Sequence, residues 1–112
     1  MAERDAVSDL IRGNIDAIVL NVIKRSDSYG YEILKDIGER TSGRYEMKEP
    51  SLKRLEKAGC VEGYWGNETQ GARRKYYRIL PAGEQELDES KIRWVEVRQI
   101  VDELLETKEG AR

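Results

Sequence analysis

The chain has 112 residues, 38% of them charged, with a net charge of −2 and neither phenylalanine nor histidine, so it has room for one compact domain with a modest core. Without histidine it lacks the commonest general base and zinc ligand, and its single cysteine, Cys60, can form neither an intramolecular disulfide nor a structural zinc site. Because its acidic residues are spread along helical faces and not paired in an apolar setting, we expect no enzyme activity and no cofactor.

The N-terminal segment, residues 1–9, has neither a basic start nor an apolar stretch, so it does not read as a signal peptide. The longest uninterrupted apolar run, Ala17 to Leu20, is far too short to cross a bilayer. A lone thiol is most stable in a reducing compartment. These features predict a cytoplasmic protein without a membrane partner.

Two amphipathic helices are predicted in the first 40 residues. Apolar residues recur at spacings of three and four from Ser8 to Arg25, which predicts one helix with Ser8 as its N-cap. Asp27 and Ser28 then offer side-chain oxygens to cap a second helix, from about Tyr29 to Arg40. The residues of the second helix expected to face inward are Ile33, Leu34 and Ile37.

A third helix is predicted from about Glu49 to Ala58, because Pro50 suits a first helical turn and Gly59 suits the position just past the last. Its apolar residues should face the core and its cations should face outward. The inward set is Leu52, Leu55 and Ala58, and the outward set is Lys53, Arg54 and Lys57.

Two aromatic segments, Cys60–Trp65 and Arg74–Leu80, flank a polar stretch bounded by glycines, which predicts an antiparallel hairpin with a flexible tip. Beyond Pro81, a long helix is expected from about Ala82 to Thr107, which would extend about 39 Å. Its apolar residues recur as in the a and d positions of a heptad, with Ser90 in the one polar slot, so we expect it to pair with its own copy. The seam positions are Leu87, Trp94, Val97, Val101 and Leu104.

Three helices followed by a hairpin is the order of a winged helix-turn-helix domain, in which the third helix enters the major groove and the hairpin, or wing, contacts the backbone or minor groove. The predicted fold is therefore mainly α, with a DNA-binding domain over residues 1–81 and a dimerisation helix and tail over residues 82–112. Residues 48–78 carry a net charge of +4, whereas residues 1–47 carry −2 and residues 79–112 carry −4. This segregation indicates a localised contact with a polyanion, although a solvated surface is the alternative.

Cations near the wing are expected to neutralise phosphates and to release condensed counterions. The wing cations are Arg73, Arg74 and Lys75. The residues of the wing tip that could reach a groove edge are Thr69, Gln70 and Gly71, although loop flexibility explains them equally well. The candidates in and before the reading helix are Lys48, Ser51, Lys53 and Arg54.

Three stretches, "SYGYEILKDI", "KRLEKAGCVEGYWGNETQGARRKYYRILPAG" and the C-terminal helix with its Trp94, closely resemble the PadR family of bacterial regulators, in particular its small members with one C-terminal helix. The resemblance covers nearly the whole chain from about Ile18 to Leu105. It implies a homodimeric repressor, joined through the C-terminal helices, whose hold on a double-stranded operator is relieved by phenolic or planar aromatic compounds.

The chain departs from the family at one place. In the family, the stretch resembling "KEPSL" is normally followed by about four residues, beginning with a tyrosine that helps to contact DNA, before "KRLEKAG". Here Leu52 is followed at once by Lys53. Either one helical turn has been deleted, which would leave the apolar face nearly in phase, or residues are missing from the numbering. A bonded pair would have Cα atoms about 3.8 Å apart.

Trp94 is a candidate for ligand binding. At helical spacing an indole is more often part of a core, but two indoles meeting near a two-fold axis would hold the helices apart and leave a slot for a flat aromatic guest. The slot walls would include Ile11 and Ile15 of the first helix and Val97 of the last. Arg98 lies one turn beyond Trp94, so no buried carboxylate is expected there, which favours neutral or anionic phenolic compounds over cations.

The sequence thus predicts a DNA-binding transcriptional regulator, a homodimeric repressor released by small aromatic or phenolic effectors. The alternative is a winged-helix protein-interaction module that does not bind DNA. A carboxylate-based hydrolase is a distant third, because no two acids are expected to converge in a cleft.

Overall fold

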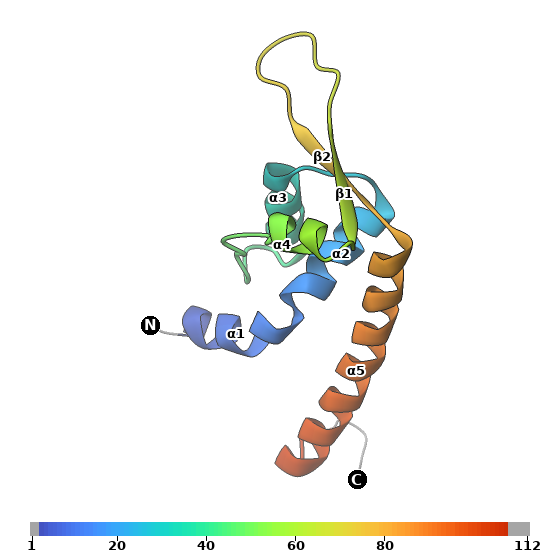
Figure 1. Cartoon of the computed structure of the whole chain (residues 1–112). Helices are drawn as coiled ribbons and strands as arrows, with labels where there is room; N and C mark the ends of the chain where they lie inside the picture. Colours follow the sequence, from blue (N-terminus) through green and yellow to red (C-terminus); the bar gives the residue numbers. More distant parts are fainter. Residues whose placement is uncertain (1–2, 108–112) are drawn as a thin grey trace.

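The computed structural model describes residues 3–107 and consists of a small helical body from which a β-hairpin and a long helix extend in opposite directions (Figure 1). This arrangement confirms the predicted winged helix-turn-helix fold with a long C-terminal helix. The helices and strands are α1 (Glu3–Ile11), the 3₁₀ turn η1 (Arg12–Asn14), α2 (Ile15–Arg25), α3 (Gly30–Arg40), α4 (Leu52–Lys57), β1 (Val61–Trp65), β2 (Lys75–Ile79) and α5 (Pro81–Leu105).

The single helix predicted from Ser8 to Arg25 is wrong. The turn η1 interrupts it, and Ser8 lies inside α1 and does not cap a helix. Gly13 and Asn14 are both poor helix formers, which explains why the α-helical path breaks at this point although the apolar spacing continues through it. The break lets α1 lead away from the body (Figure 1).

The core lies around α2, which packs against α5, β2 and α3, while α4 packs against β1. The predicted inward residues Ile33 and Ile37 are buried, and Leu34 packs at the edge of the core. The largest fully buried side chains are Leu20, Ile23, Ile33, Leu87, Val19 and Val61. At about 1.5–3 kcal/mol for each large aliphatic side chain, this cluster is the main stabilising element of the domain.

Helix α4 is shorter than the predicted Glu49–Ala58. Pro50 lies before it, and Ser51, at the N-cap, has a left-handed backbone (φ 54°) with no capping side-chain bond. Leu52 and Lys53 are the first two residues of this helix, which has only six residues. Gly59 ends the helix as predicted, with a φ of 79°.

Of the three residues of α4 expected to face inward, Leu52 and Leu55 are buried. Ala58 is exposed, contrary to the prediction, because the helix ends one residue before it. The outward cations Lys53, Arg54 and Lys57 are exposed as predicted.

The predicted hairpin is present as an antiparallel pair, β1 with β2, with Val61 opposite Ile79 and Trp65 opposite Lys75. An isolated bridge joins Ser28 to Tyr77, with the two backbone N–H groups donating over 3.2 and 2.8 Å. Ser28 therefore does not cap α3. Its hydroxyl donates to Glu32 (2.7 Å), and the N-cap residue of α3, Tyr29, receives no side-chain cap.

The long helix α5 begins at Pro81, whose missing N–H is not needed in the first turn. The first turn of α5 packs closely against the backbone of Cys60, just before β1. A Cβ placed on Gly83 would lie only 2.2 Å from the carbonyl oxygen of Cys60, so the position has room only for glycine. Leu87 is 1% exposed and belongs to the core of its own chain. It therefore has no surface left for a partner subunit, and the predicted seam loses its first position. The rest of α5 extends beyond the body and gives extents of 59 × 33 × 22 Å.

Candidate DNA-binding surface and ligand pocket

The wing cation Arg73 keeps an exposed guanidinium with no acidic partner among the described residues. Its Nε donates to the carbonyl oxygen of Gly66 (3.2 Å), and the guanidinium carbon lies 5.8 Å from the ring centroid of Trp65. Both partners are neutral, so the positive charge of Arg73 stays uncompensated at the surface of the hairpin. An exposed cation of this kind can meet a phosphate without first giving up an ion pair.

The other two wing cations have partners that the sequence did not reveal. Arg74 lies 3.6 Å from the carboxylate of Glu68 and 4.9 Å from the ring centroid of Tyr29. The ammonium of Lys75 lies 3.5 Å from Glu56 of α4. Arg74 and Lys75 would therefore have to exchange an acidic partner of their own chain for a phosphate, whereas Arg73 would not.

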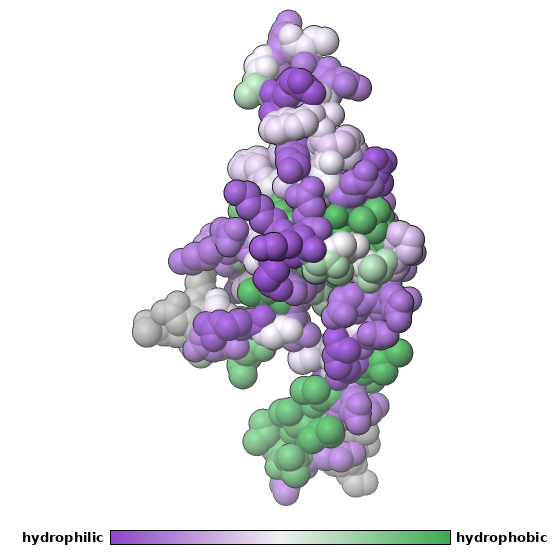
Figure 2. Space-filling model, in the orientation of Figure 1, coloured by the Kyte–Doolittle hydropathy of each residue, from purple (hydrophilic) through white to green (hydrophobic). Residues whose placement is uncertain are grey.

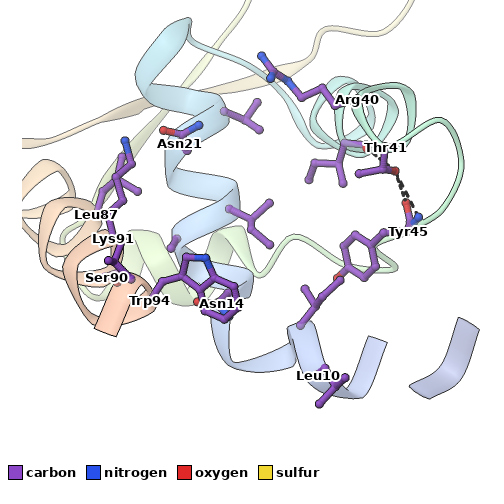
Figure 3. A pocket seen from close by; sticks show the side chains of 16 residues that line it. Leu10, Asn14, Asn21, Arg40, Thr41, Tyr45, Leu87, Ser90, Lys91 and Trp94 are labelled. Carbon is purple, nitrogen blue, oxygen red and sulfur yellow. Dashed lines mark hydrogen bonds between the residues drawn. The ribbon is translucent and has the colours of Figure 1, made fainter. Parts of the chain in front are cut away.

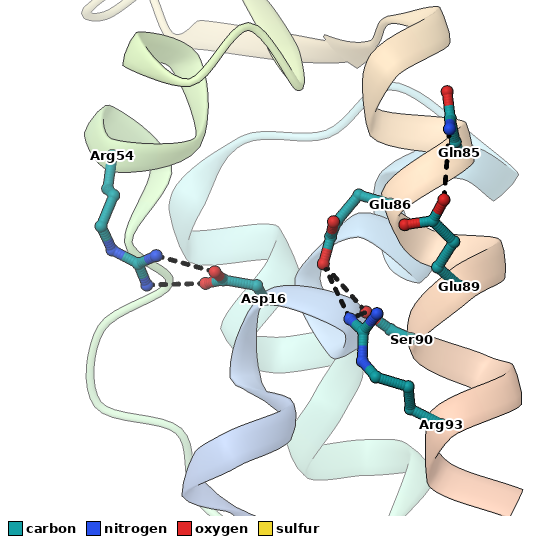
Figure 4. Close-up of polar contacts among 7 residues, drawn as sticks. All are labelled: Asp16, Arg54, Gln85, Glu86, Glu89, Ser90 and Arg93. Atoms are coloured by element: carbon teal, nitrogen blue, oxygen red, sulfur yellow. Dashed lines mark hydrogen bonds and ion pairs between the residues drawn. The ribbon is translucent and has the colours of Figure 1, made fainter.

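In and before α4, Lys48 and Lys53 are exposed and pair with no acid in the part of the chain that the structure describes. Ser51 is half-buried at the start of the helix. Arg54 makes a bidentate ion pair with Asp16 at the start of α2, with distances of 2.6 and 2.7 Å (Figure 4). The hydrogen bond to Asp16 is the largest of the effects that raise the pKa of Arg54. Two of the five N–H donors of Arg54 are thereby engaged.

The wing tip is open. Thr69, Gln70 and Gly71 are exposed, and Gly71 has a φ of 74°, which a residue with a side chain rarely adopts. A glycine there lets the loop turn back toward Arg73. No described side chain crosses the tip, so the polar groups of these three residues face solvent.

A cavity of about 680 Å³ lies between α1, α2, α3 and α5 (Figure 3). The indole of Trp94 and the phenol ring of Tyr45 face it from opposite sides. Its walls are mainly apolar, and its charged lining residues, Arg40 and Lys91, are both basic. Its volume is typical of sites for small organic ligands. The lining residues are Leu10, Ile11, Asn14, Ala17, Ile18, Asn21, Val22, Ile37, Arg40, Thr41, Tyr45, Leu87, Ser90, Lys91, Trp94 and Val95.

Of the residues predicted to bind a ligand, the structure brings Trp94 and Ile11 together at this cavity. Ile15, Val97 and Arg98 are not part of its lining; Ile15 packs against the core instead. Tyr45 was missed because it belongs to the irregular segment between α3 and α4, where no periodicity indicates a direction. Its burial raises the pKa of its hydroxyl.

The outer part of α5 exposes a continuous apolar surface, visible in Figure 2 at the C-terminal end of the helix. The predicted seam positions Trp94, Val97, Val101 and Leu104 all belong to it. Ser90, the polar slot of the seam, is instead engaged within its own helix, donating to Glu86 and accepting from Arg93 (Figure 4). The exposed large apolar residues of α5 are Ile92, Trp94, Val95, Val97, Ile100, Val101, Leu104 and Leu105.

None of the described helices combines the length and the apolar character that a bilayer crossing requires. No cluster of three cysteine, aspartate or glutamate side chains within residues 3–107 has a geometry that could hold a metal ion.

Comparison with known proteins gives one consistent result. A family model described as the transcriptional regulator PadR-like family matches residues 19–89. A protein of Lysinibacillus sphaericus named Uncharacterized protein X is 43% identical over 103 residues, which cover 88% of this chain and 94% of that protein. Among solved structures, a transcriptional regulator from Clostridium thermocellum is 39% identical with a TM-score of 0.79, covering 86% of this chain and 94% of that one. A PadR family regulator from Eggerthella lenta is 30% identical with a TM-score of 0.80, covering 93% and 92%.

Proposed function

Because the chain belongs to the PadR-like family of DNA-binding transcriptional regulators, we propose that it is a cytoplasmic homodimeric repressor that releases its operator when a planar aromatic or phenolic compound binds. The observation that carries this proposal is the combination, in one small chain, of an uncompensated wing cation, a long helix with an unpartnered apolar face, and an apolar cavity between that helix and the helical body. Each of these three features supports one part of the function.

DNA binding is proposed to use two surfaces. Arg73 and the wing tip (Thr69, Gln70 and Gly71) contact the backbone or minor groove, and Lys48, Ser51 and Lys53 lie along the major groove with α4. Arg54 could join them through the N–H donors that Asp16 does not engage, although the ion pair reduces its net charge. Two copies related by a two-fold axis would meet half-sites about one turn, roughly 34 Å, apart on a palindromic operator.

Dimerisation is proposed to bury the apolar face of α5 against the same face of a second copy, along Trp94, Val97, Val101 and Leu104. Exposed apolar residues in contiguous patches are uncommon on monomeric proteins and typically mark an interface. Leu10 of α1, also largely exposed, extends the apolar surface beside the cavity mouth. Self-association explains why a 25-residue helix is fixed to the body at one end only.

The effector is proposed to enter the cavity beside Trp94 and Ile11. An aromatic ring can stack on the indole, and Arg40 and Lys91 favour a neutral or anionic compound over a cation, because the lining includes no carboxylate. Occupancy would change the angle between α5 and the body and hence the spacing of the two α4 helices. A coupling of about 1–3 kcal/mol is enough for a 5- to 150-fold loss of DNA affinity.

The DNA-binding part is tested by titrating a labelled duplex over a range of salt. If the protein binds mainly through contacts to the DNA phosphates, its affinity should fall steeply as the salt concentration rises. Arg73→Ala should reduce the steepness of this fall. Arg98→Ala on α5 removes the same charge far from the wing and should leave the dependence unchanged. If the wild type shows no DNA affinity even at low salt, the proposal fails.

The effector part is tested by tryptophan fluorescence during titration with a panel of planar aromatic compounds, since the chain has only two tryptophans. Quenching that persists in Trp65→Phe and disappears in Trp94→Phe is the expected result. The reverse pattern would exclude the cavity as the site.

A second candidate, a winged-helix protein-interaction module, is favoured by one observation: Arg54, Arg74 and Lys75 are all paired with acids of their own chain. Such pairing reduces the charge available for phosphates. Absence of DNA binding at low salt, together with a stable homodimer, would support this candidate in place of the repressor.

A further inference from the structure

The carboxylate of Glu68 is folded back onto the wing from the loop that joins the strands. It accepts hydrogen bonds from the backbone N–H of Arg74 (3.2 Å) and from the hydroxyl of Tyr76 (3.1 Å). Its side chain is only 19% exposed, although it belongs to a surface loop. A side chain on Gly66 would prevent this conformation, because a Cβ there would lie 2.6 Å from the Glu68 carboxylate.

Aromatic contacts connect this carboxylate to the start of α3. The ring of Tyr76 lies edge-on to that of Tyr29 (5.2 Å between centroids) and stacks on that of Tyr64 (5.9 Å). The hydroxyl of Tyr64 in turn donates to Asp27, just before α3. The loop, both strands and the helical body are therefore joined by one continuous set of contacts that begins at Glu68.

Within this set, Arg74 acts as a structural cation. Its guanidinium lies between the carboxylate of Glu68 and the ring of Tyr29. A cation that already has an anionic partner gains less from a phosphate, because it must first give up that partner. Arg73, one residue earlier, has only neutral partners and loses no ion pair on meeting DNA.

We propose that Glu68 is a positioning residue of the wing: it holds the hairpin against α3 through Arg74 and Tyr76, and it thereby leaves Arg73 as the phosphate-binding cation of the Arg73–Lys75 triplet. This inference rests on the proposed DNA binding. It divides three adjacent cations, which look equivalent in the sequence, into one contact residue and two structural residues.

The carboxyl group is ionised at neutral pH in this arrangement. The hydrogen bond from its own backbone N–H, followed by those from Arg74 and Tyr76, lowers the pKa of Glu68 against the opposing effect of burial. Removing the charge while keeping the shape, as in Glu68→Gln, is therefore the appropriate perturbation. Glu62→Gln is the matched control, because Glu62 lies on the same hairpin and pairs with Arg78, which meets this set at the ring of Tyr64 and not at Glu68 or Arg74.

The DNA measurement uses fluorescence anisotropy of a labelled duplex of random sequence, titrated at several salt concentrations. Arg73→Ala should reduce the slope of log K against log salt by about 0.9 per wing, the value for one phosphate contact. Arg74→Ala and Glu68→Gln should weaken binding several-fold relative to Glu62→Gln, with little change in slope. The double variant Glu68→Gln/Arg74→Ala should bind no more weakly than Arg74→Ala alone, because the two residues act as a unit.

The structural role of Glu68 can also be tested without DNA. In a Trp94→Phe background the remaining tryptophan, Trp65, reports on the wing. Its anisotropy should fall in Glu68→Gln, because the hairpin gains motion, and should stay unchanged in Glu62→Gln. Thermal unfolding of both variants should match the parent, since neither residue belongs to the buried core.

Three results would overturn the inference: tighter binding with a steeper slope in Glu68→Gln, which would make Glu68 a competitor of phosphates; an equal loss of slope in Arg74→Ala and Arg73→Ala; or an unchanged Trp65 anisotropy in Glu68→Gln. If no protein binds the duplex but the anisotropy falls as expected, the proposed function fails while the structural role of Glu68 stands.

Discussion

Truncation of Leu104 is expected to weaken the proposed dimer far more than truncation of Ile92. Both side chains lie on α5 and are strongly exposed, 78% for Leu104 and 68% for Ile92. With Trp94 at an a position of the heptad, Leu104 falls at d, in the seam, and Ile92 falls at f, the outermost position. Alanine is a good helix former, so neither change should unfold the helix.

The magnitude follows from burial and symmetry. Burying a leucine side chain contributes about 1.5–3 kcal/mol, and a two-fold interface contains two copies, so Leu104→Ala should cost the dimer about 3–6 kcal/mol. Every 1.4 kcal/mol is a factor of ten, and the dissociation constant should therefore rise by about two to four orders of magnitude. Ile92→Ala should change it less than threefold, since about 0.5 kcal/mol is the usual limit for a surface site.

Sedimentation equilibrium at several protein concentrations measures both constants. The reasoning is refuted if the two variants weaken the dimer equally, because the apolar face would then not have the heptad geometry. It is also refuted if the wild type is monomeric at micromolar concentration. DNA titrations on the same samples would show whether Leu104→Ala loses operator affinity together with the dimer. This loss is expected if both copies of a dimer must contact one duplex.

Two further predictions concern the hairpin and its junction with α5. Gly83→Ala should lower the melting temperature by at least about 4 °C, because the new Cβ would lie 2.2 Å from the oxygen of Cys60 and overpacking costs about 1–3 kcal/mol; Gly38→Ala, with open space around it in α3, should raise it at the same protein concentration, and equal effects would contradict the close contact. The hydrogen bond to Asp27 raises the pKa of Tyr64 above its ordinary value. The folded state thus favours the neutral phenol, and the contact should be intact below pH about 10 and lost as pH rises beyond it. Ultraviolet titration of tyrosinate should show that Tyr64→Phe removes a late-titrating group; loss of an ordinary one would contradict this.

The elements that were predicted well are those whose own residues determine them. In α3 the spacing of Ile33 and Ile37 gives both the helix and its buried face, and in the hairpin the aromatic strands and the glycine-bounded loop give the pairing. The errors arise where a distant partner decides. Ser28 is an eligible N-cap by type, but its backbone pairs with Tyr77, 49 residues away, and its side chain turns to Glu32.

For the candidate site as well, the location of residues could be predicted from the sequence, but their partners could not. The hairpin location of Arg73 and Arg74 follows from the strand pattern, and both are found there. Which of the two is paired depends on the path of an irregular loop that brings Glu68 back to the strands. Likewise Asp16 and Arg54 are 38 residues apart and meet only because the fold brings the start of α2 beside α4. A charge count over residues 48–78 cannot distinguish a paired cation from a free one.

The length of α4 determines how this chain can recognise DNA. Six residues extend about 9 Å, so few side chains can reach base edges, and the one with a bidentate fork, Arg54, is bound to Asp16. Lysine offers a mobile point charge in place of a planar fork, so Lys53 contributes attraction and little discrimination between bases. In the proposed complex, most of the affinity would then come from phosphate contacts at Arg73 and from having two copies on one duplex. In the proposed dimer, the apolar face of α5 is therefore as necessary for operator binding as the short helix α4, because it is the surface that would bring in the second copy.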